Sequence, residues 1–308
     1  MATSPALPSP ARTGGRFGKY LGIGPFVFFV STDIPPLAAM IETLYDGFPI
    51  ADASAAHFAD FHVGVNRVPG LRSIVRRQAV FDIDGVRPFF PLATGQALMM
   101  LEGGLNWTIA ENTSFCLVIH AGVVERDGQA IVLPAPSGGG KSTLTAGLVH
   151  RGWRLLSDEL ALLSLEDGML SALARPIALK NESIDVIRRA APNSWMTPPM
   201  PHIEGGNVIY LKPPADSVAR VNERAAPAFV VAPRYQRDVP GALAEPKSKP
   251  DAFKELAEGT YRFSLYGRRG FETLAGLVDR SQCYDVVFSD LDAAIEACDR
   301  ITRSPRHR

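Results

Sequence analysis

The sequence predicts an α/β fold with a smaller α+β module ahead of it. Three observations support this prediction. Strand-like and helix-like segments alternate through the second half of the chain, a glycine cluster joins a buried strand to a helix, and the first hundred residues carry strand patterns without a chemical motif. We therefore expect a leader, an N-terminal α+β module, a main domain with C-terminal helices, and a tail, at residues 1–18, 19–113, 114–303 and 304–308.

Composition excludes several classes of protein. The chain has 308 residues, of which 46% are hydrophobic, and its 32 Lys and Arg equal its 32 Asp and Glu. A balanced charge gives no field that attracts nucleic acid or an anionic membrane. No stretch has the eighteen apolar residues of a membrane-spanning helix, and Cys116, Cys283 and Cys298 have no metal-binding spacing. We expect a cytoplasmic protein with buried, unpaired thiols.

The N-terminal module begins with recognisable elements. The first sixteen residues are rich in Pro, Ser and Gly, and we expect them to be disordered. Leu21–Val30 is expected to form one buried strand. Asp33 can cap a helix that opens with two prolines and ends at Gly47. Further strands are expected at "FADFHVGVNRV", at "AVFDIDGVRPFF" with a turn at Asp84-Gly85, and at "LNWTIA".

The main domain begins with a strand pair that leads into the glycine cluster. Strands are expected at Cys116–Glu125 and Gln129–Pro134, joined by the Asp127-Gly128 turn. The helix that starts at Lys141 is expected to end at Gly152 in a left-handed cap. The segment "WRLLSDELALLSL" then predicts two strands around a pair of acids, with another hairpin turn after them.

The rest of the chain alternates between helices and strands. Asn181 can cap a helix with acids in its first turn and arginines toward its end, and a Pro/Gly-rich loop follows from Ser194 to Asn207. Strands are expected at "NVIYLKPP", "PAFVVAPRY" and "YDVVFS", and helices at Asp251–Glu258, about Arg269–Val278 and "DLDAAIEACDRI".

The glycine cluster "APSGGGKS" has the pattern of a P-loop, with Ala135 in place of the first glycine. Glycines allow backbone N–H groups to turn inward around phosphate oxygens, and the N-terminus of the following helix adds positive charge. Lys141 would reach the β- and γ-phosphates, and the Ser142 hydroxyl would bind magnesium. We expect ATP or another nucleoside triphosphate with Mg²⁺, bound by Ser137, Gly138, Gly139, Gly140, Lys141, Ser142 and Thr143.

The acid pair follows the loop closely. Asp158 lies seventeen residues after Lys141, with one helix between them, so we expect it on the strand beside the P-loop strand. This spacing and the absence of an LSGGQ-type segment disfavour transport and motor ATPases. Asp158 can hold magnesium or accept a proton from a hydroxyl, and Glu159 can take the other role. Arg175, Lys212 and Arg220 are further candidates for contacts to phosphate.

Three segments resemble the HPr kinase/phosphorylase family. They are "HAG" at His120–Gly122, "APSGGGKS", and "RGWRLLSDE". The similarity to the HPr kinase-related kinases of type A is wider and includes "LKNESI", "YLKPP" and "SDLDAAI". The resemblance implies a kinase fold of the phosphoenolpyruvate-carboxykinase type and a homo-oligomer.

The resemblance also implies roles for individual residues. Asp158 would be the base toward a hydroxyl acceptor, His120 would lie near it, and Glu182 would supply a carboxylate for the metal, with Lys180 and Asn181 beside it. Because Ala135 and Glu159 depart from the family pattern and the segment for phosphorolysis is not recognisable, we do not expect phosphorylase activity.

The predicted nucleotide-site residues do not identify the acceptor of the phosphoryl group. The N-terminal module and the loop from Ser194 to Asn207 would select it, and a Ser or Thr hydroxyl of a peptide or small carrier protein is a reasonable hypothesis. Two alternatives stay open. One is a nucleotide-dependent binding module, and the other is an NTPase that uses water as its acceptor.

Overall fold

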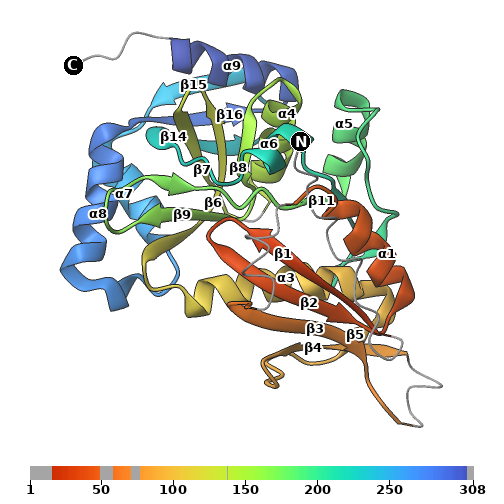
Figure 1. The fold of residues 1–308 in the computed structure, drawn as a ribbon. Helices are drawn as coiled ribbons and strands as arrows, with labels where there is room; N and C mark the ends of the chain where they lie inside the picture. Colours follow the sequence, from red (N-terminus) through yellow and green to blue (C-terminus); the bar gives the residue numbers. More distant parts are fainter. Residues whose placement is uncertain (1–15, 49–57, 71–76, 137, 304–308) are drawn as a thin grey trace, which may run out of the picture. The chain divides into compact units, whose positions relative to one another are not determined.

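The computed structural model describes residues 16–48, 58–70, 77–136 and 138–303, so most of the expected leader and Ser137 lie outside the described residues. The protein is a mixed α/β structure with several sheets (Figure 1). Contacts divide it into two compact units. Unit 1 comprises Met1–Thr108 with Met200–Ile203, and unit 2 comprises Ile109–Pro199 with Glu204–Arg308.

Unit 1 is built on a five-stranded sheet of order β1-β2-β3-β4-β5. The strands are β1 (Phe17–Ile23), β2 (Phe26–Thr32), β3 (Phe61–Arg67), β4 (Gln78–Ile83) and β5 (Leu92–Ala93). Strands β2 and β3 are parallel, and the other neighbours are antiparallel. The expected single strand at Leu21–Val30 is wrong. Gly24, with φ +58, and Pro25 turn the chain, so the segment forms the hairpin of β1 and β2.

Helix α1 (Pro35–Leu44) has the expected prolines at its start, but its cap differs from the prediction. Ile34 occupies the N-cap position. Asp33 Oδ1 instead accepts a hydrogen bond of 2.8 Å from the Arg67 backbone N–H, which joins the helix start to the end of β3. The short elements η1 (Thr94–Gln96) and β12 (Met200–Pro201) also belong to this unit.

The expected strand at "LNWTIA" is also wrong, because residues 105–110 belong to helix α3 (Ala97–Asn112). Side chains at helical spacing are fully buried, namely Leu98, Leu101, Leu105 and Ile109. Gly104 allows the helix to approach β4 closely, since a Cβ there would lie 2.2 Å from a ring carbon of Phe81.

Unit 2 is built on a sheet of order β10-β9-β6-β7-β14-β16-β15, with β8 also paired to β6. Its strands are β6 (Cys116–Arg126), β7 (Gln129–Pro134), β8 (Arg154–Ser157), β9 (Leu160–Ser164), β10 (Leu170–Ser171), β14 (Ala226–Tyr235), β15 (Ala242–Pro246) and β16 (Gln282–Phe288). Strands β7, β14 and β16 are parallel. Their carboxyl ends therefore meet at one edge. The predicted hairpin around Asp127-Gly128 is confirmed.

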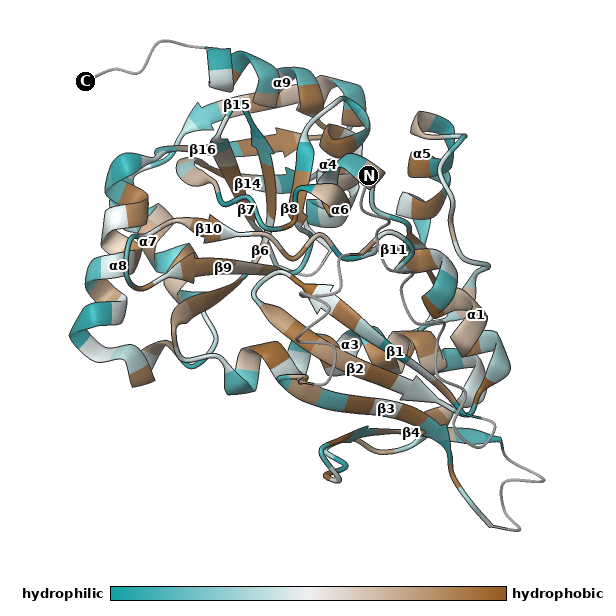
Figure 2. Cartoon of the chain, in the orientation of Figure 1, coloured by the Kyte–Doolittle hydropathy of each residue, from teal (hydrophilic) through white to brown (hydrophobic). Residues whose placement is uncertain are grey.

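Helices cover both faces of this sheet (Figure 1). The helices of unit 2 are α4 (Lys141–His150), α5 (Glu182–Ala190), α6 (Ala215–Ala219), α7 (Lys249–Glu258), α8 (Gly267–Arg280) and α9 (Leu291–Arg303), with the short η2 (Phe263–Tyr266). Leu133 of β7 packs with α4 and α9, and its neighbour Val132 packs with α7 and α8. Figure 2 shows the matching pattern, with hydrophobic residues in the strands and hydrophilic stretches on α8 and α9. Strand β11 (Ile177–Lys180) pairs with β13 (Asn207–Leu211) separately.

All three cysteines are buried and free, as predicted. Burial raises the pKa of Cys116 and of Cys298 to about 12, so these thiols stay protonated and unreactive. Within the described ranges, no helix has the length and apolar character needed to cross a membrane.

Candidate functional site

The predicted phosphate-binding loop leaves β7 and enters α4 at the carboxyl ends of the parallel strands. Gly138 and Gly140 have φ of +84 and +89, conformations that L side chains rarely adopt. A Cβ at Gly140 would also lie 2.8 Å from the Phe288 ring. The Tyr235 N–H donates to the Gly139 carbonyl at 3.0 Å, which fixes the loop to the end of β14. The glycines thus meet steric demands of the loop itself.

Helix α4 begins with Lys141, Ser142 and Thr143, the residues predicted to face phosphate. The first N–H groups of a helix have no partner within it, and they carry the positive end of the helix dipole. The helix start lies tightly on β6 at Gly122, where a Cβ would be 2.6 Å from Thr145 Oγ1 and 3.4 Å from Lys141 Cγ. The glycine of the "HAG" segment therefore sets how closely Lys141 approaches the sheet.

Asp158 and Glu159 occupy the turn between β8 and β9, at the end of the returning strand as predicted. The expectation that this strand neighbours the P-loop strand is wrong. Strand β8 pairs with β6, while β7 pairs with β6 and β14. Because β6 is antiparallel to both β7 and β8, the ends of β7 and β8 still reach the same edge. The Leu160 N–H donates to Ser157 Oγ at 3.0 Å and holds the turn closed.

Glu159 connects two of the other predicted residues. Its Oε2 lies 3.1 Å from His120 Nε2 and 3.5 Å from Lys141 Nζ. His120 comes from β6, Lys141 from the first turn of α4, and Glu159 from the β8–β9 turn. Three separate elements thus converge on one carboxylate oxygen. His120 contacts Glu159, the acid next to the one that the resemblance assigned to it.

The surroundings of Asp158 and Glu159 shift the pKa values of these two acids in opposite directions. Burial is the main cause that raises the pKa of Asp158 to about 7, and the negative charge of Glu159 raises it further, against the smaller opposing effect of the Lys141 charge. Burial also opposes ionisation of Glu159. The hydrogen bond from His120 and the charges of Lys141 and His120 outweigh it and lower the pKa of Glu159 to about 2. Glu159 is therefore the anion of the pair, and Asp158 holds its proton up to near-neutral pH.

Several buried polar atoms of the site lack a hydrogen-bond partner among the described residues. They are Lys141 Nζ, Thr145 Oγ1 and both carboxylate oxygens of Asp158. Buried polar atoms are normally satisfied, and exceptions gather where a ligand supplies the partner. A buried ammonium group and a buried carboxyl group beside a helix N-terminus match the donors and acceptors that a phosphate group and a hydrated cation need. The residues present therefore fit ATP with Mg²⁺.

The structure places the remaining candidates less centrally. Glu182 begins α5, and its Oε1 lies 3.2 Å from Arg237 Nη2, with both side chains exposed. Lys180 is close enough for its charge to contribute to the low pKa of Glu159. Asn181 stands at the N-cap of α5 as expected, but its Oδ1 accepts from the Asn207 N–H at 3.2 Å and makes no cap hydrogen bond. Across the described parts of the chain, no three His, Cys, Asp or Glu side chains form a metal-binding group.

Arg220, a candidate for phosphate contact, belongs to an ion-pair network instead. Its Nη2 lies 2.8 Å from Glu223 Oε2 and 3.7 Å from Glu125 Oε2. Glu125 in turn binds the buried Arg154. The positive charge of Arg220 is therefore paired with acidic side chains of unit 2.

Sequence reasoning missed Tyr261. The backbone of residues 259–261 runs along β6 beside His120, with the Tyr261 N–H donating to the Val118 carbonyl at 2.9 Å. Tyr261 is 40% exposed, and its pKa is raised by partial burial and then by the charge of Glu159. No local pattern signals this neighbourhood, because the two paired segments are far apart in the sequence.

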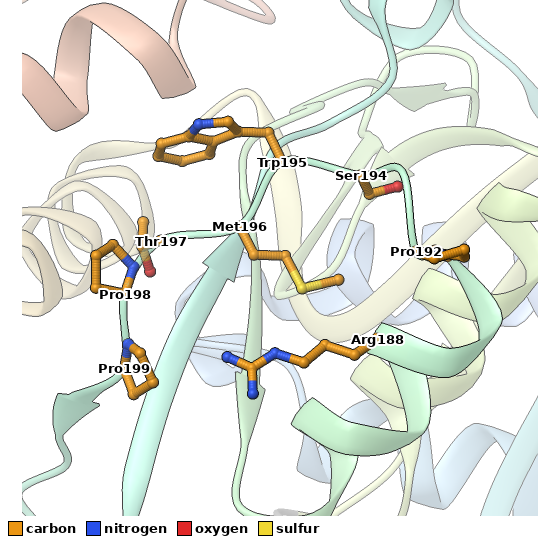
Figure 3. Close-up of a pocket in the computed structure, with 9 residues that line it drawn as sticks. Arg188, Pro192, Ser194, Trp195, Met196, Thr197, Pro198 and Pro199 are labelled. Carbon is orange, nitrogen blue, oxygen red and sulfur yellow. The ribbon is translucent and has the colours of Figure 1, made fainter.

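A separate open groove of about 650 Å³ lies along the end of α5 (Figure 3). It is lined by Arg188, Ala191, Pro192, Ser194, Trp195, Met196, Thr197, Pro198 and Pro199. Its residues include the first part of the loop expected to select an acceptor, and none of the predicted nucleotide-site residues. The Thr197 N–H donates to the Tyr210 carbonyl of β13 at 3.0 Å, and the Trp195 carbonyl accepts from Lys212 just after β13 at 3.0 Å, which fixes this wall of the groove.

Comparisons with known proteins give similarities to a protein family and to solved structures. The family model described as SynChlorMet cassette protein ScmC matches residues 95–178, a range that contains the glycine loop and the acid pair. Among solved structures, the chain is similar to the Hpr(Ser) kinase/phosphatase from Coxiella burnetii, with 12% identity and a TM-score of 0.27, over 60% of this chain and 97% of that chain. The search of curated proteins finds no match.

Proposed function

We propose that this protein is an ATP- and Mg²⁺-dependent kinase with a P-loop fold of the HPr kinase/phosphoenolpyruvate-carboxykinase type. It transfers the γ-phosphoryl group to a hydroxyl, with Ser or Thr of a peptide or small protein as the proposed acceptor. One observation carries the proposal. Lys141 begins the helix that follows a glycine loop, and its Nζ lies 3.5 Å from Glu159 Oε2. Glu159 is ionised, and the adjacent Asp158 holds its proton up to near-neutral pH.

The loop and the helix start bind and orient the nucleotide. The backbone N–H groups of Gly138 and of residues 140–143 and the Lys141 ammonium group neutralise phosphate charge, which is the main contribution a protein makes to phosphoryl transfer. Lys141 is buried, so its charge is little screened by water. Its contact with Glu159 holds the ammonium group in place without closing a hydrogen bond that phosphate would have to break.

Magnesium would be held by the Ser142 hydroxyl and by Glu159, with Glu182 as a further carboxylate. The ion would offset the charge on the β- and γ-phosphates. Glu159 suits this role because an acid with a pKa of about 2 is ionised throughout the physiological range. Ser142 suits it because it lies in the first turn of α4, where the loop delivers phosphate.

Asp158 suits the role of general base. A base is most effective when its pKa lies near the working pH, and that of Asp158 is about 7. It would accept the proton of the acceptor hydroxyl while the oxygen forms its bond to the γ-phosphorus and ADP leaves. His120 fixes the orientation of the adjacent Glu159 and thereby the turn that carries Asp158.

The test is transfer of label from [γ-³²P]ATP with magnesium to components of a lysate from the source cells. The kinase predicts label on a discrete acceptor with the wild type and none with Lys141→Ala. The exposed Lys254, which pairs with Glu258 on α7, offers a matched control in Lys254→Ala. Release of label only as inorganic phosphate would indicate an NTPase, and ATP binding without turnover would indicate a binding module.

A further inference from the structure

The segment Gly259–Tyr261 extends the sheet beside the site. The Gly259 carbonyl accepts from the His120 N–H at 2.8 Å, the Tyr261 N–H donates to the Val118 carbonyl at 2.9 Å, and Thr260 forms an antiparallel bridge with Ile119. These bonds use the edge of β6 that β7 occupies further along. The segment thus follows directly on the position where β7 ends and the glycine loop begins.

The register places the Tyr261 side chain on the same face as the candidate site. Alternate residues of β6 face opposite sides of a sheet, and Gly122 faces Lys141 and Thr145 of α4, while Ile119 packs with α7 and α8. His120 therefore shares the face of Gly122. Tyr261 lies opposite Val118, on this face, at a diagonal of about 7–8 Å from His120, a separation that aromatic side chains span.

Contacts on both sides hold this segment in place. Thr260 Oγ1 donates to the Leu256 carbonyl at 2.7 Å, on the opposite face. Arg262 adopts φ +53 and donates to the Glu111 carbonyl, and Tyr266 Oη donates to the Thr113 carbonyl at 2.9 Å. Since the backbone is fixed before and after it, Tyr261 presents its ring from a rigid support.

We propose that Tyr261 lines the acceptor subsite, where its ring and hydroxyl contact the incoming hydroxyl compound and limit the access of water. The inference rests on the proposed function. It follows from the position of Tyr261 beside His120 and from its exposure of 40%, which leaves part of the side chain available to a bound molecule. Burial, and then the charge of Glu159, raise the pKa of Tyr261, in agreement with this position and with a phenol that stays protonated as a donor.

The subsite has a defined chemistry. Asp158 supplies the carboxyl group that takes the proton, and Tyr261 supplies an aromatic face and one O–H donor. An acceptor held against the ring has its hydroxyl near the acid pair, while water arriving from that side is excluded. Loss of the ring should therefore weaken acceptor binding and increase the share of γ-phosphoryl groups that reach water.

The experiment compares Tyr261→Ala and Tyr261→Phe with the wild type and with Tyr284→Phe. Tyr284 is a control because its hydroxyl bonds only to Gln282 in the described structure, on a strand away from the acid pair. The acceptor labelled by the wild type is isolated and used as substrate. Four quantities are measured: the affinity for MgATP, KM and kcat for the acceptor, the ratio of labelled acceptor to inorganic phosphate, and the melting temperature.

For Tyr261→Ala we expect unchanged MgATP affinity and folding, a KM for the acceptor raised about tenfold or more, and a larger fraction of phosphate released to water. Tyr261→Phe isolates the hydroxyl and should give a smaller rise. An unchanged KM and an unchanged ratio in Tyr261→Ala, with an active wild type, would overturn the subsite and leave the kinase standing. A wild type that labels no acceptor would overturn the kinase and the subsite together.

Discussion

His120 Nε2 lies 3.1 Å from Glu159 Oε2, and this contact ties β6 to the turn that carries the acid pair. Lys141 approaches the same oxygen at 3.5 Å. The hydrogen bond from His120 and the charge of Lys141 keep Glu159 ionised, and burial, together with the negative charge of Glu159, keeps the proton on Asp158. One carboxylate therefore links the residue predicted to bind phosphate to the residue predicted to act as base.

Replacing Lys141 should weaken nucleotide binding. A hydrogen bond to a charged group contributes about 1.5–3 kcal/mol, so Lys141→Ala should weaken MgATP binding by roughly 10- to 100-fold. Isothermal titration of MgATP into the variant and into Lys254→Ala measures the difference. Equal affinities in the two variants would show that Lys141 does not contact the nucleotide.

Alanine substitutions at two glycines distinguish the cost of a left-handed backbone conformation from an effect on nucleotide binding. Gly138 in the loop and Gly128 in the β6–β7 turn have φ of +84 and +77, and a Cβ at either would meet no atom within 4 Å. Alanine at each position should cost about 1–2 kcal/mol of stability, because both would hold Ala in a left-handed conformation.

Only Gly138→Ala should also weaken MgATP binding, since its Cβ would project beside the backbone N–H groups that face phosphate. Denaturant unfolding gives the stability of each variant, and titration gives the affinity. A loss of affinity of the same size in Gly128→Ala would mean that general destabilisation, and not the loop, is responsible.

Because helix α4 packs closely against β6, we expect that no side chain is tolerated at position 122. A Cβ there would lie 2.6 Å from Thr145 Oγ1, so Gly122→Ala should destabilise the protein by about 1–3 kcal/mol and shift Lys141. Gly103 in α3 provides the contrast because a Cβ there would meet open space, and Gly103→Ala should be neutral or stabilising by up to about 1 kcal/mol. Urea midpoints compare the two. A neutral Gly122→Ala would contradict the packing at this position.

The raised pKa of Asp158 predicts how stability depends on pH. The folded state holds the proton to about pH 7, whereas the unfolded chain releases it near 3.8, so the folded state binds more protons between these values. The contribution of protonated Asp158 to the free energy of unfolding is therefore fully present below about pH 4, and it is lost as the pH rises to about 7.

Asp158→Asn, which cannot ionise, should remove this loss and gain stability relative to the wild type at pH 8, by an amount on the order of 1–4 kcal/mol. Unfolding free energies at pH 4 and pH 8 test this, with the exposed Asp279→Asn as control. A difference between Asp158→Asn and wild type that stays constant over this range would refute a proton-holding Asp158.

Local patterns were sufficient to predict the central strand–loop–helix unit. The Asp127-Gly128 turn, the glycine cluster and the alternating apolar residues define β6, β7 and α4, and Gly152, with φ +90, follows α4 as expected. Each of these features depends on residues close together in the sequence. The hairpin after the acid pair was predictable for the same reason.

The turn at Gly24 and Pro25 was a local signal that the sequence reasoning overlooked, whereas three other features depend on distant partners. Residues 105–110 include strand-forming residue types, but they fold as part of helix α3. The close packing of Gly104 in this helix against Phe81 is a contact between residues distant in the sequence. The pairing of β8 with β6 decides where Asp158 lies, and nothing in the residues of β8 specifies that partner. Tyr261 reaches His120 through pairing with residues about 140 positions earlier, which a single sequence cannot reveal.

The most direct test of the account is phosphoryl transfer by Asp158→Asn. A base of this kind contributes about 10²- to 10⁴-fold to the rate, while the phosphates are bound by the loop and Lys141. We therefore predict that the variant binds MgATP with wild-type affinity and transfers label from [γ-³²P]ATP to the acceptor at least about 100-fold more slowly. Transfer at the wild-type rate with intact binding would contradict the central role of Asp158.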